Sequence, residues 1–232
     1  MDKMMCLDNF FCDINAEPGL YGLYSVPGLG KQELITYISQ MIVRRNKGKP
    51  LIITELSEKQ WKTEMGEYGL STEGITIIEY KEGCSIRKII KEFSPTIIFI
   101  HLYSRYLPLA DDQASISRLK ELSLEYSVSI VLLIHLYRNS GDNDPVYRRP
   151  QLYDLIDTYP RDKTIGEFTE DMRKFNAIVF LHRCHDWYRN IGIGHAFHIC
   201  NEAELMVFKF GFSPPDSIYF DFSQIIEGKV WE

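Results

Sequence analysis

A lysine preceded by two glycines lies near the start of the chain, in the segment 25–32, which reads Ser-Val-Pro-Gly-Leu-Gly-Lys-Gln. A run of the type G-x-x-x-x-G-K-[ST] between a strand and a helix binds phosphate, because its backbone N–H groups curl around the phosphate oxygens. The helix N-terminus adds a partial positive charge, and the lysine reaches the terminal phosphates. The segment therefore predicts a phosphate loop with ATP or ADP as its ligand. The expected nucleotide-binding residues are Gly28, Gly30, Lys31 and Gln32.

Two positions of this segment depart from the pattern. Ser25 stands where the first glycine is expected, and Gln32 stands where a serine or threonine would hold Mg²⁺. Magnesium favours compact oxygen ligands in octahedral geometry, and the longer glutamine side chain is a poorer ligand in that place. Bound Mg²⁺ is therefore not expected. The alternative interpretation of the segment is a tight strand-to-helix turn whose lysine is solvated.

Short β-rich runs alternate with helix-length amphipathic stretches along the chain. The expected strands are Leu20–Tyr24, Leu51–Thr54, Ile75–Ile78, Thr96–Leu102, Ser129–His135, Ala177–His182, Leu205–Phe208 and Ser217–Phe222. The expected helices are Gln32–Asn46, Ser57–Glu67, Cys84–Phe93 and Ala114–Tyr126. Continuously apolar strands are typical of a parallel sheet covered by helices on both faces. The order predicts an α/β three-layer sandwich whose central strand ends at Tyr24 and whose last strands pair antiparallel.

Further segments follow the phosphate loop in an order that is similar to a known family. They are 51–60, 75–80, 85–93, 97–102, 118–122, 128–138, 149–155, 175–188 and 204–209. In this order and spacing the chain resembles a RecA-type P-loop ATPase, and specifically the C-terminal motor domain of DnaB-like replicative helicases. The resemblance runs from about residue 7 to 222. It implies a single RecA-like domain over residues 1–232, with 1–19 as a short lead-in.

The resemblance also locates the catalytic positions, and most of them hold other residues. His101 stands at the Walker B position, where a carboxylate would order Mg²⁺, and His135 stands at the sensor glutamine position. No arginine lies two residues after Lys209, where the family's finger motif would place it. Glu55 alone remains as a candidate water-activating base. Each missing group would stabilise phosphoryl transfer, so efficient ATP hydrolysis is not expected. The resemblance then implies degenerate Walker motifs and a binding or regulatory role, set in DNA replication.

Two alternative functions remain open. The first is an active, helicase-like ATPase in which relocated ligands such as Asp111 or Glu55 replace the missing aspartate. The second is a zinc- or partner-binding module on the same fold, since His-x2-His occurs twice. The histidines concerned are His182, His185, His195 and His198. Residues three apart in a strand point to opposite faces, so zinc is not expected.

The pair His101 and His135 has a simpler interpretation. Both end expected strands, so they are expected to lie side by side, half-buried or hydrogen-bonded. A soft metal or a proton switch between them is the alternative.

Nucleic-acid contacts would fall on one polar loop, because arginine reaches phosphate and tyrosine stacks on bases. The candidates are Arg138, Tyr147, Arg148 and Arg149. Acidic residues at 142 and 144 dilute the positive field of this loop. A solvated loop of mixed charge is therefore the favoured interpretation.

Composition excludes several classes of protein. The 232 residues are 45% hydrophobic and 25% charged, with a net charge of −6, which fits one globular domain and excludes disordered and collagen-like chains. No apolar run reaches the ~18 residues of a membrane span, and acids interrupt the N-terminal stretch where a secretory signal would be apolar. A cytoplasmic protein without a membrane partner is predicted, with its five cysteines reduced. The lead-in is too short for a helicase linker, so we expect an unknown protein partner or oligomer in place of a self-made translocating ring.

Overall fold

The computed structural model describes residues 14, 16–25, 28–81, 84–101, 116–136, 150, 155, 164–185, 199–208 and 216–226. The strands are β1 (Gly19–Ser25), β2 (Pro50–Thr54), β3 (Thr76–Glu79), β4 (Ile97–His101), β5 (Ser129–His135), β6 (Ala177–His185), β7 (Ile199–Phe208) and β8 (Asp216–Asp221). The helices are α2 (Lys31–Arg44), α3 (Glu58–Glu67), α4 (Ile86–Phe93), α5 (Ile116–Glu125), α7 (Ile165–Arg173) and α8 (Ser223–Ile226).

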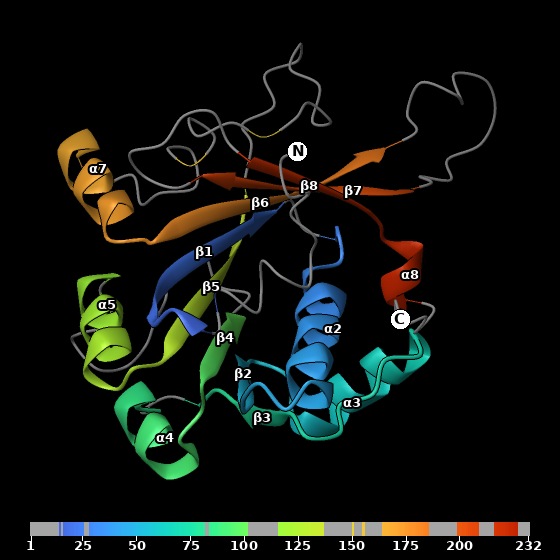
Figure 1. Ribbon diagram of the computed structural model, residues 1–232, viewed down its shortest axis with the longest axis horizontal. Coiled ribbons are helices and arrows are strands. Elements are labelled where there is room, and N and C mark those ends of the chain that lie inside the picture. The colour runs from blue at the N-terminus through green and yellow to red at the C-terminus, as the bar shows by residue number, and fades with distance from the viewer. Residues whose placement is uncertain are drawn as a thin grey trace.

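All eight strands form one sheet in the order β3-β2-β4-β5-β1-β6-β7-β8 (Figure 1). The first six strands in this order, β3 through β6, run parallel. β7 pairs antiparallel with both β6 and β8. β1 therefore lies inside the sheet, between β5 and β6. The predicted α/β fold, with its mostly parallel sheet and antiparallel last strands, is confirmed.

Helices cover both faces of the sheet (Figure 1). α2, α3 and α8 lie on one face, and α4, α5 and α7 lie on the other. The continuously apolar strands explain this arrangement, since neighbouring side chains of a strand point to opposite faces. In β4, for example, Phe99 packs into the core under α2, whereas Ile98 and Ile100 pack under α4 and α5.

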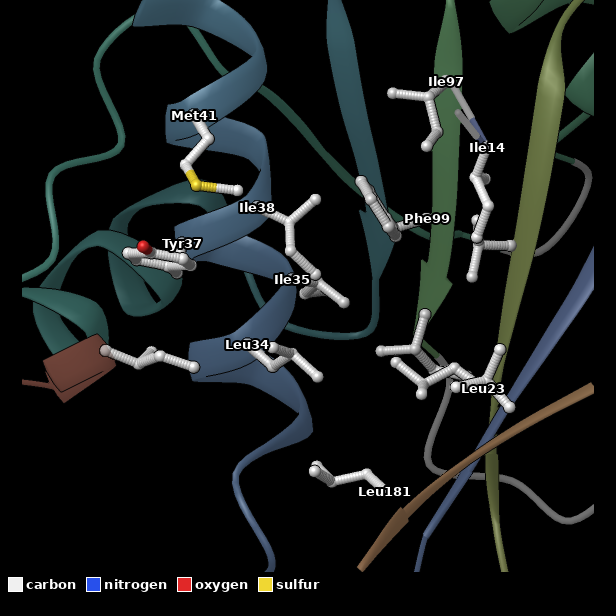
Figure 2. Close-up of a cluster of buried hydrophobic side chains, with 14 of the residues drawn as sticks. Ile14, Leu23, Leu34, Ile35, Tyr37, Ile38, Met41, Ile97, Phe99 and Leu181 are labelled. Carbon is white, nitrogen blue, oxygen red and sulfur yellow. The ribbon is translucent and has the colours of Figure 1, made fainter. Parts of the chain in front are cut away.

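The core under α2 is made by one stripe of that helix. Leu34, Ile35 and Ile38 are 0% exposed, which fits their spacing on one helical face. Figure 2 shows Ile35 and Ile38 projecting from α2 toward Phe99. This packing fixes the position of α2, and with it the segment that precedes the helix.

Helix α3 begins with a capping box that the sequence pattern did not predict in full. Ser57 precedes the helix, and a glutamine rather than an acid follows three residues later. In the structure the side-chain amide of Gln60 completes the box: its Oε1 accepts from the Ser57 backbone N–H at 3.0 Å. The backbone N–H of Gln60 in turn donates to Ser57 Oγ at 3.3 Å. A glutamine serves as well as a glutamate here because the bond needs only an acceptor oxygen.

We expect Ser57→Ala to lower the free energy of unfolding by about 1 kcal/mol, because it removes the side chain on which this cap depends. Urea denaturation monitored by circular dichroism would measure the change. Thr63→Ala is the matched control, since Thr63 lies exposed inside the same helix. An equal loss in both variants would contradict the capping assignment.

Other elements differ from expectation in length or in being new. The predicted strand Leu205–Phe208 begins earlier, at Ile199, because β7 pairs along its length with β6 and β8. α7 was not predicted, and Gly166 near its start is a poor helix former. Among the described residues, no helix has the length and apolar character needed to cross a membrane.

Candidate functional site

The carboxyl ends of three parallel strands bring the site together. Register pairs Ser25 at the end of β1 with His135 at the end of β5. The next strand, β4, ends with His101 at the same edge. Ligands of open α/β sheets bind at this edge, beyond the carboxyl ends of the strands. The site therefore lies where α2 begins.

The described part of the predicted phosphate loop adopts left-handed backbone at both glycines. Gly28 has φ 80° and Gly30 has φ 91°, values that a residue with a side chain rarely adopts. Gly30 is the N-cap of α2, and no side chain caps the helix. The N–H groups and positive dipole end of a helix in this position favour an anion. The structure thus places the loop between β1 and α2, as the sequence predicts.

The amine of Lys31 turns toward the strand ends. Its Nζ donates to the Ser25 carbonyl oxygen at 2.9 Å and to Ser25 Oγ at 2.7 Å. Nζ also lies 3.3 Å from Nδ1 of His135, which accepts this bond when the ring carries its proton on Nε2. The serine that replaces the first glycine of the pattern therefore has a function in this arrangement: it holds the lysine.

Burial changes the charge of this lysine. Lys31 is only 4% exposed, and its three hydrogen-bonding partners are neutral. Burial lowers the pKa of Lys31 from 10.5 to about 7, and the charge of Glu33 opposes this shift. Near neutral pH the amine is therefore partly uncharged, unlike an ordinary lysine. An anion entering the site would supply the missing negative charge.

The two histidines stand side by side. Their ring centroids are 6.1 Å apart at an angle of 60°, and the His101 ring also lies 5.8 Å from Trp61. Burial, followed by the charges of Lys31 and His135, lowers the pKa of His101 to about 3. Burial and the charge of Lys31 lower the pKa of His135 to about 4. Both rings are neutral at pH 7 and add no negative charge to the site.

Gln32 lies in the first turn of α2, half-buried. The backbone carbonyl oxygen of Gln32 accepts from the Thr36 hydroxyl at 2.8 Å, and Trp61 Nε1 donates to Thr36 Oγ1 at 3.2 Å. α3 is thereby tied to the start of α2. Glu55 follows the end of β2 and is exposed.

Several predicted residues lie outside the described part of the chain. They include Asp111, Arg138, Tyr147, Arg148, Arg149, His195, His198 and Lys209, and the side chain of His185. Of the four histidines considered for zinc, His182 alone has a described side chain, and it is half-buried in β6. Within the described residues, no group of three or more His, Cys, Asp or Glu could hold a metal.

Sequence reasoning missed two residues beside the loop. The ring of Phe222, just after β8, occupies the space next to Gly30. A Cβ added to Gly30 would overlap Cζ of this ring. The guanidinium of Arg183 lies over that ring, 3.9 Å from its centroid. No spacing rule could have found them, because Phe222 is close to Gly30 only through tertiary packing, which also brings α8 against α2.

The comparisons agree on the fold. No protein-family model and no curated protein matches the chain. One solved ATPase domain superposes with a TM-score of 0.61 at 15% identity, covering 97% of this chain and 90% of that one. A DnaB-like replicative helicase, described with its interactions with primase, gives a TM-score of 0.60 at 14% identity over 89% of this chain. A KaiC-like protein from the hyperthermophilic archaeon Pyrococcus horikoshii gives 0.54 at 14% identity over 88% of this chain and 85% of that one.

These similarities establish the RecA-like ATPase fold for this chain. At such low identity the similarity concerns the fold and does not extend to activity. The chain spans 57% of the length of the DnaB-like helicase.

Proposed function

We propose that this chain is a RecA-like P-loop domain that binds ATP or ADP with little or no hydrolysis, in a binding or regulatory role. The observation that carries the proposal is the buried amine of Lys31, held by Ser25 and His135 at the start of α2. A phosphate group would provide this amine with a counter-charge that its present partners lack.

The same arrangement is a reason to expect little ATP hydrolysis. Phosphoryl transfer needs a metal ion ordered by oxygen ligands, and neutral imidazoles at the ends of β4 and β5 are poor partners for Mg²⁺. Gln32 stands at the remaining metal position. Glu55 is exposed at the end of β2, where a base without an ordered metal has little transition state to stabilise.

The setting of this function is also part of the proposal. One structure similar to this chain is a DnaB-like helicase described with primase, which favours a protein partner or an oligomer and a place in DNA replication. We also propose a cytoplasmic location, which is the expectation from the sequence.

Thermal unfolding with ADP, in the presence and absence of Mg²⁺, tests the proposal. We expect ADP to raise the unfolding temperature by a similar amount in both conditions, and ATP hydrolysis to stay near background. Glu55→Gln should leave that background unchanged. In contrast, Gln32→Thr combined with His101→Asp should make ADP binding depend on Mg²⁺, because oxygen ligands are restored.

Strong Mg²⁺-dependent ATP hydrolysis by the unmodified protein, lost in Glu55→Gln, would contradict the proposal. That result would favour the active ATPase instead. Absence of any response to ATP, ADP or pyrophosphate would reject nucleotide binding itself.

A further inference from the structure

Phe222 is the residue through which the C-terminal part of the described chain reaches the phosphate loop. It lies between β8 and α8 and is 1% exposed. A Cβ built on Gly30 would overlap Cζ of its ring and would lie 2.7 Å from Cε1 and 3.2 Å from Cε2. The edge of the ring therefore fills the space where any other residue at position 30 would carry a side chain.

Several interactions hold the ring in this place. The guanidinium of Arg183, on β6, lies over its face at 3.9 Å from the centroid, a distance typical of a cation–π contact. Arg183 is itself buried, at 8% exposed. The Phe222 carbonyl oxygen accepts from the N–H groups of Ile225 and Ile226 at 3.1 and 3.3 Å, which starts α8. The backbone and the ring of Phe222 are therefore both fixed.

Arg183 also acts on the first turn of α2. Burial raises the pKa of Glu33, and the charge of Arg183 is among the effects that oppose this increase. One buried guanidinium thus influences both the ring against Gly30 and a carboxyl group three residues further along. The contact between Phe222 and Gly30 therefore belongs to a small cluster that includes the charged side chains of Arg183 and Glu33.

We propose that Phe222, backed by Arg183, is a positioning residue that holds Gly30 at its left-handed dihedral angles and so sets the direction of the phosphate loop. Gly30 is the N-cap of α2, and Lys31 follows it directly. A rotation at Gly30 would turn the first N–H groups of the helix and the Lys31 side chain away from one common ligand. This inference rests on the proposed function, because the loop is positioned for phosphate.

The test compares Phe222→Leu with Phe175→Leu. Phe175 is a matched control because it is also buried, at 3% exposed, but lies in the core on the other face of the sheet. Both changes should lower the stability by a similar amount. We expect Phe222→Leu alone to weaken ADP and pyrophosphate binding roughly tenfold, since small displacements of a binding group are costly.

Hydrogen exchange gives a second measurement that needs no ligand. Phe222→Leu should speed the exchange of the Leu34 amide, which donates to the Gly30 carbonyl oxygen at 3.0 Å, whereas Phe175→Leu should leave it unchanged. If the unmodified protein binds neither ADP nor pyrophosphate, the proposed function fails and exchange alone decides the role of Phe222. Equal effects of the two changes on affinity, or on exchange where no ligand binds, would overturn the inference.

A double-mutant cycle isolates the contact itself. Gly30→Ala should displace the phosphate loop and weaken ADP binding in the otherwise unmodified protein, because its Cβ collides with the ring. In the Phe222→Ala background only the backbone strain remains, so Gly30→Ala should reduce the ADP affinity several-fold less than it does in the unmodified protein. Where no ligand binds, Gly30→Ala should likewise cause a smaller loss of protection from hydrogen exchange in that background. Additive effects of the two changes would show that Phe222 does not position Gly30.

Discussion

Replacing Lys31 with methionine should abolish the thermal shift caused by ADP without destabilising the protein. Methionine keeps the length and apolar volume of the lysine side chain but removes its charge. Hydrogen bonds from a charged donor are worth about 1.5–3 kcal/mol each, so losing two to a phosphate corresponds to a drop in affinity of at least ~100-fold. The amine is buried among neutral partners, so its removal also relieves the desolvation of a charge.

Because Lys31→Met should weaken ADP binding without lowering the stability of the protein, the two effects can be separated. We expect Lys31→Met to unfold at or above the temperature of the unmodified protein while no longer responding to ADP. Lys88→Met serves as the control, because Lys88 is exposed on α4, on the far face of the sheet. An unchanged ADP response in Lys31→Met would show that the lysine does not bind phosphate. Unfolding well below the unmodified protein would show instead that the lysine is mainly structural.

The affinity for ADP should fall as the pH rises from about 7 to about 9. Burial lowers the pKa of Lys31 to about 7 in the protein as described, and a bound phosphate would raise it again. Below pH 7 the amine is charged with or without ligand, so affinity is at its full value. Above pH 7 binding must take up a proton, and the affinity falls by up to tenfold per pH unit until the pKa of the complex is reached.

The two histidines facing Lys31 leave this pH range clear. His135 from β5 and His101 from β4 have pKa values of about 4 and about 3 and are neutral throughout. The pKa of Glu33 on α2 is raised by burial. The ligand is fully ionised above the second phosphate pKa of about 6. A decline above pH 7 that disappears in Lys31→Arg therefore reports on the lysine and not on Glu33.

Calorimetric titration in buffers of different ionisation enthalpy would count the protons. We expect uptake approaching one proton per ADP at pH 8.5 and close to none at pH 6.5. Lys31→Arg should bind, if at all, with little dependence on pH, because a guanidinium stays charged. A flat affinity between pH 7 and 9 in the unmodified protein would mean that Lys31 is fully charged before the ligand arrives.

Most strands could be predicted from local sequence because of how deeply they are buried. Runs such as 97–100 are apolar at every position, which only a strand covered on both faces requires. The glycine–lysine segment was equally local, since the loop needs residues that are neighbours in the chain. α7 was less predictable, because tertiary packing of Met172 stabilises a helix with a glycine near its start.

The site itself could be predicted only as a set of positions. Sequence order placed His101 and His135 at neighbouring strand ends, and the structure brings them together. It did not indicate that Lys31 would turn toward Ser25, because the direction of a side chain depends on the burial around it. Phe222 could not be found at all, since its contact with Gly30 depends on the whole sheet being assembled.

The position of β1 has a consequence for the order in which the chain can fold. Its two neighbours in the sheet are β5, where Gly19 pairs with Ser129, and β6, where Tyr21 pairs with Ala177. On a ribosome, β1 emerges before either partner and stays without one until the roughly one hundred residues between it and β5 have been made. Pairings this distant along the chain slow folding, and an apolar strand left unpaired in the meantime invites association with other chains. Antiparallel β7 and β8 pair with near neighbours, so the sheet can grow at that edge as soon as β6 has docked on β1.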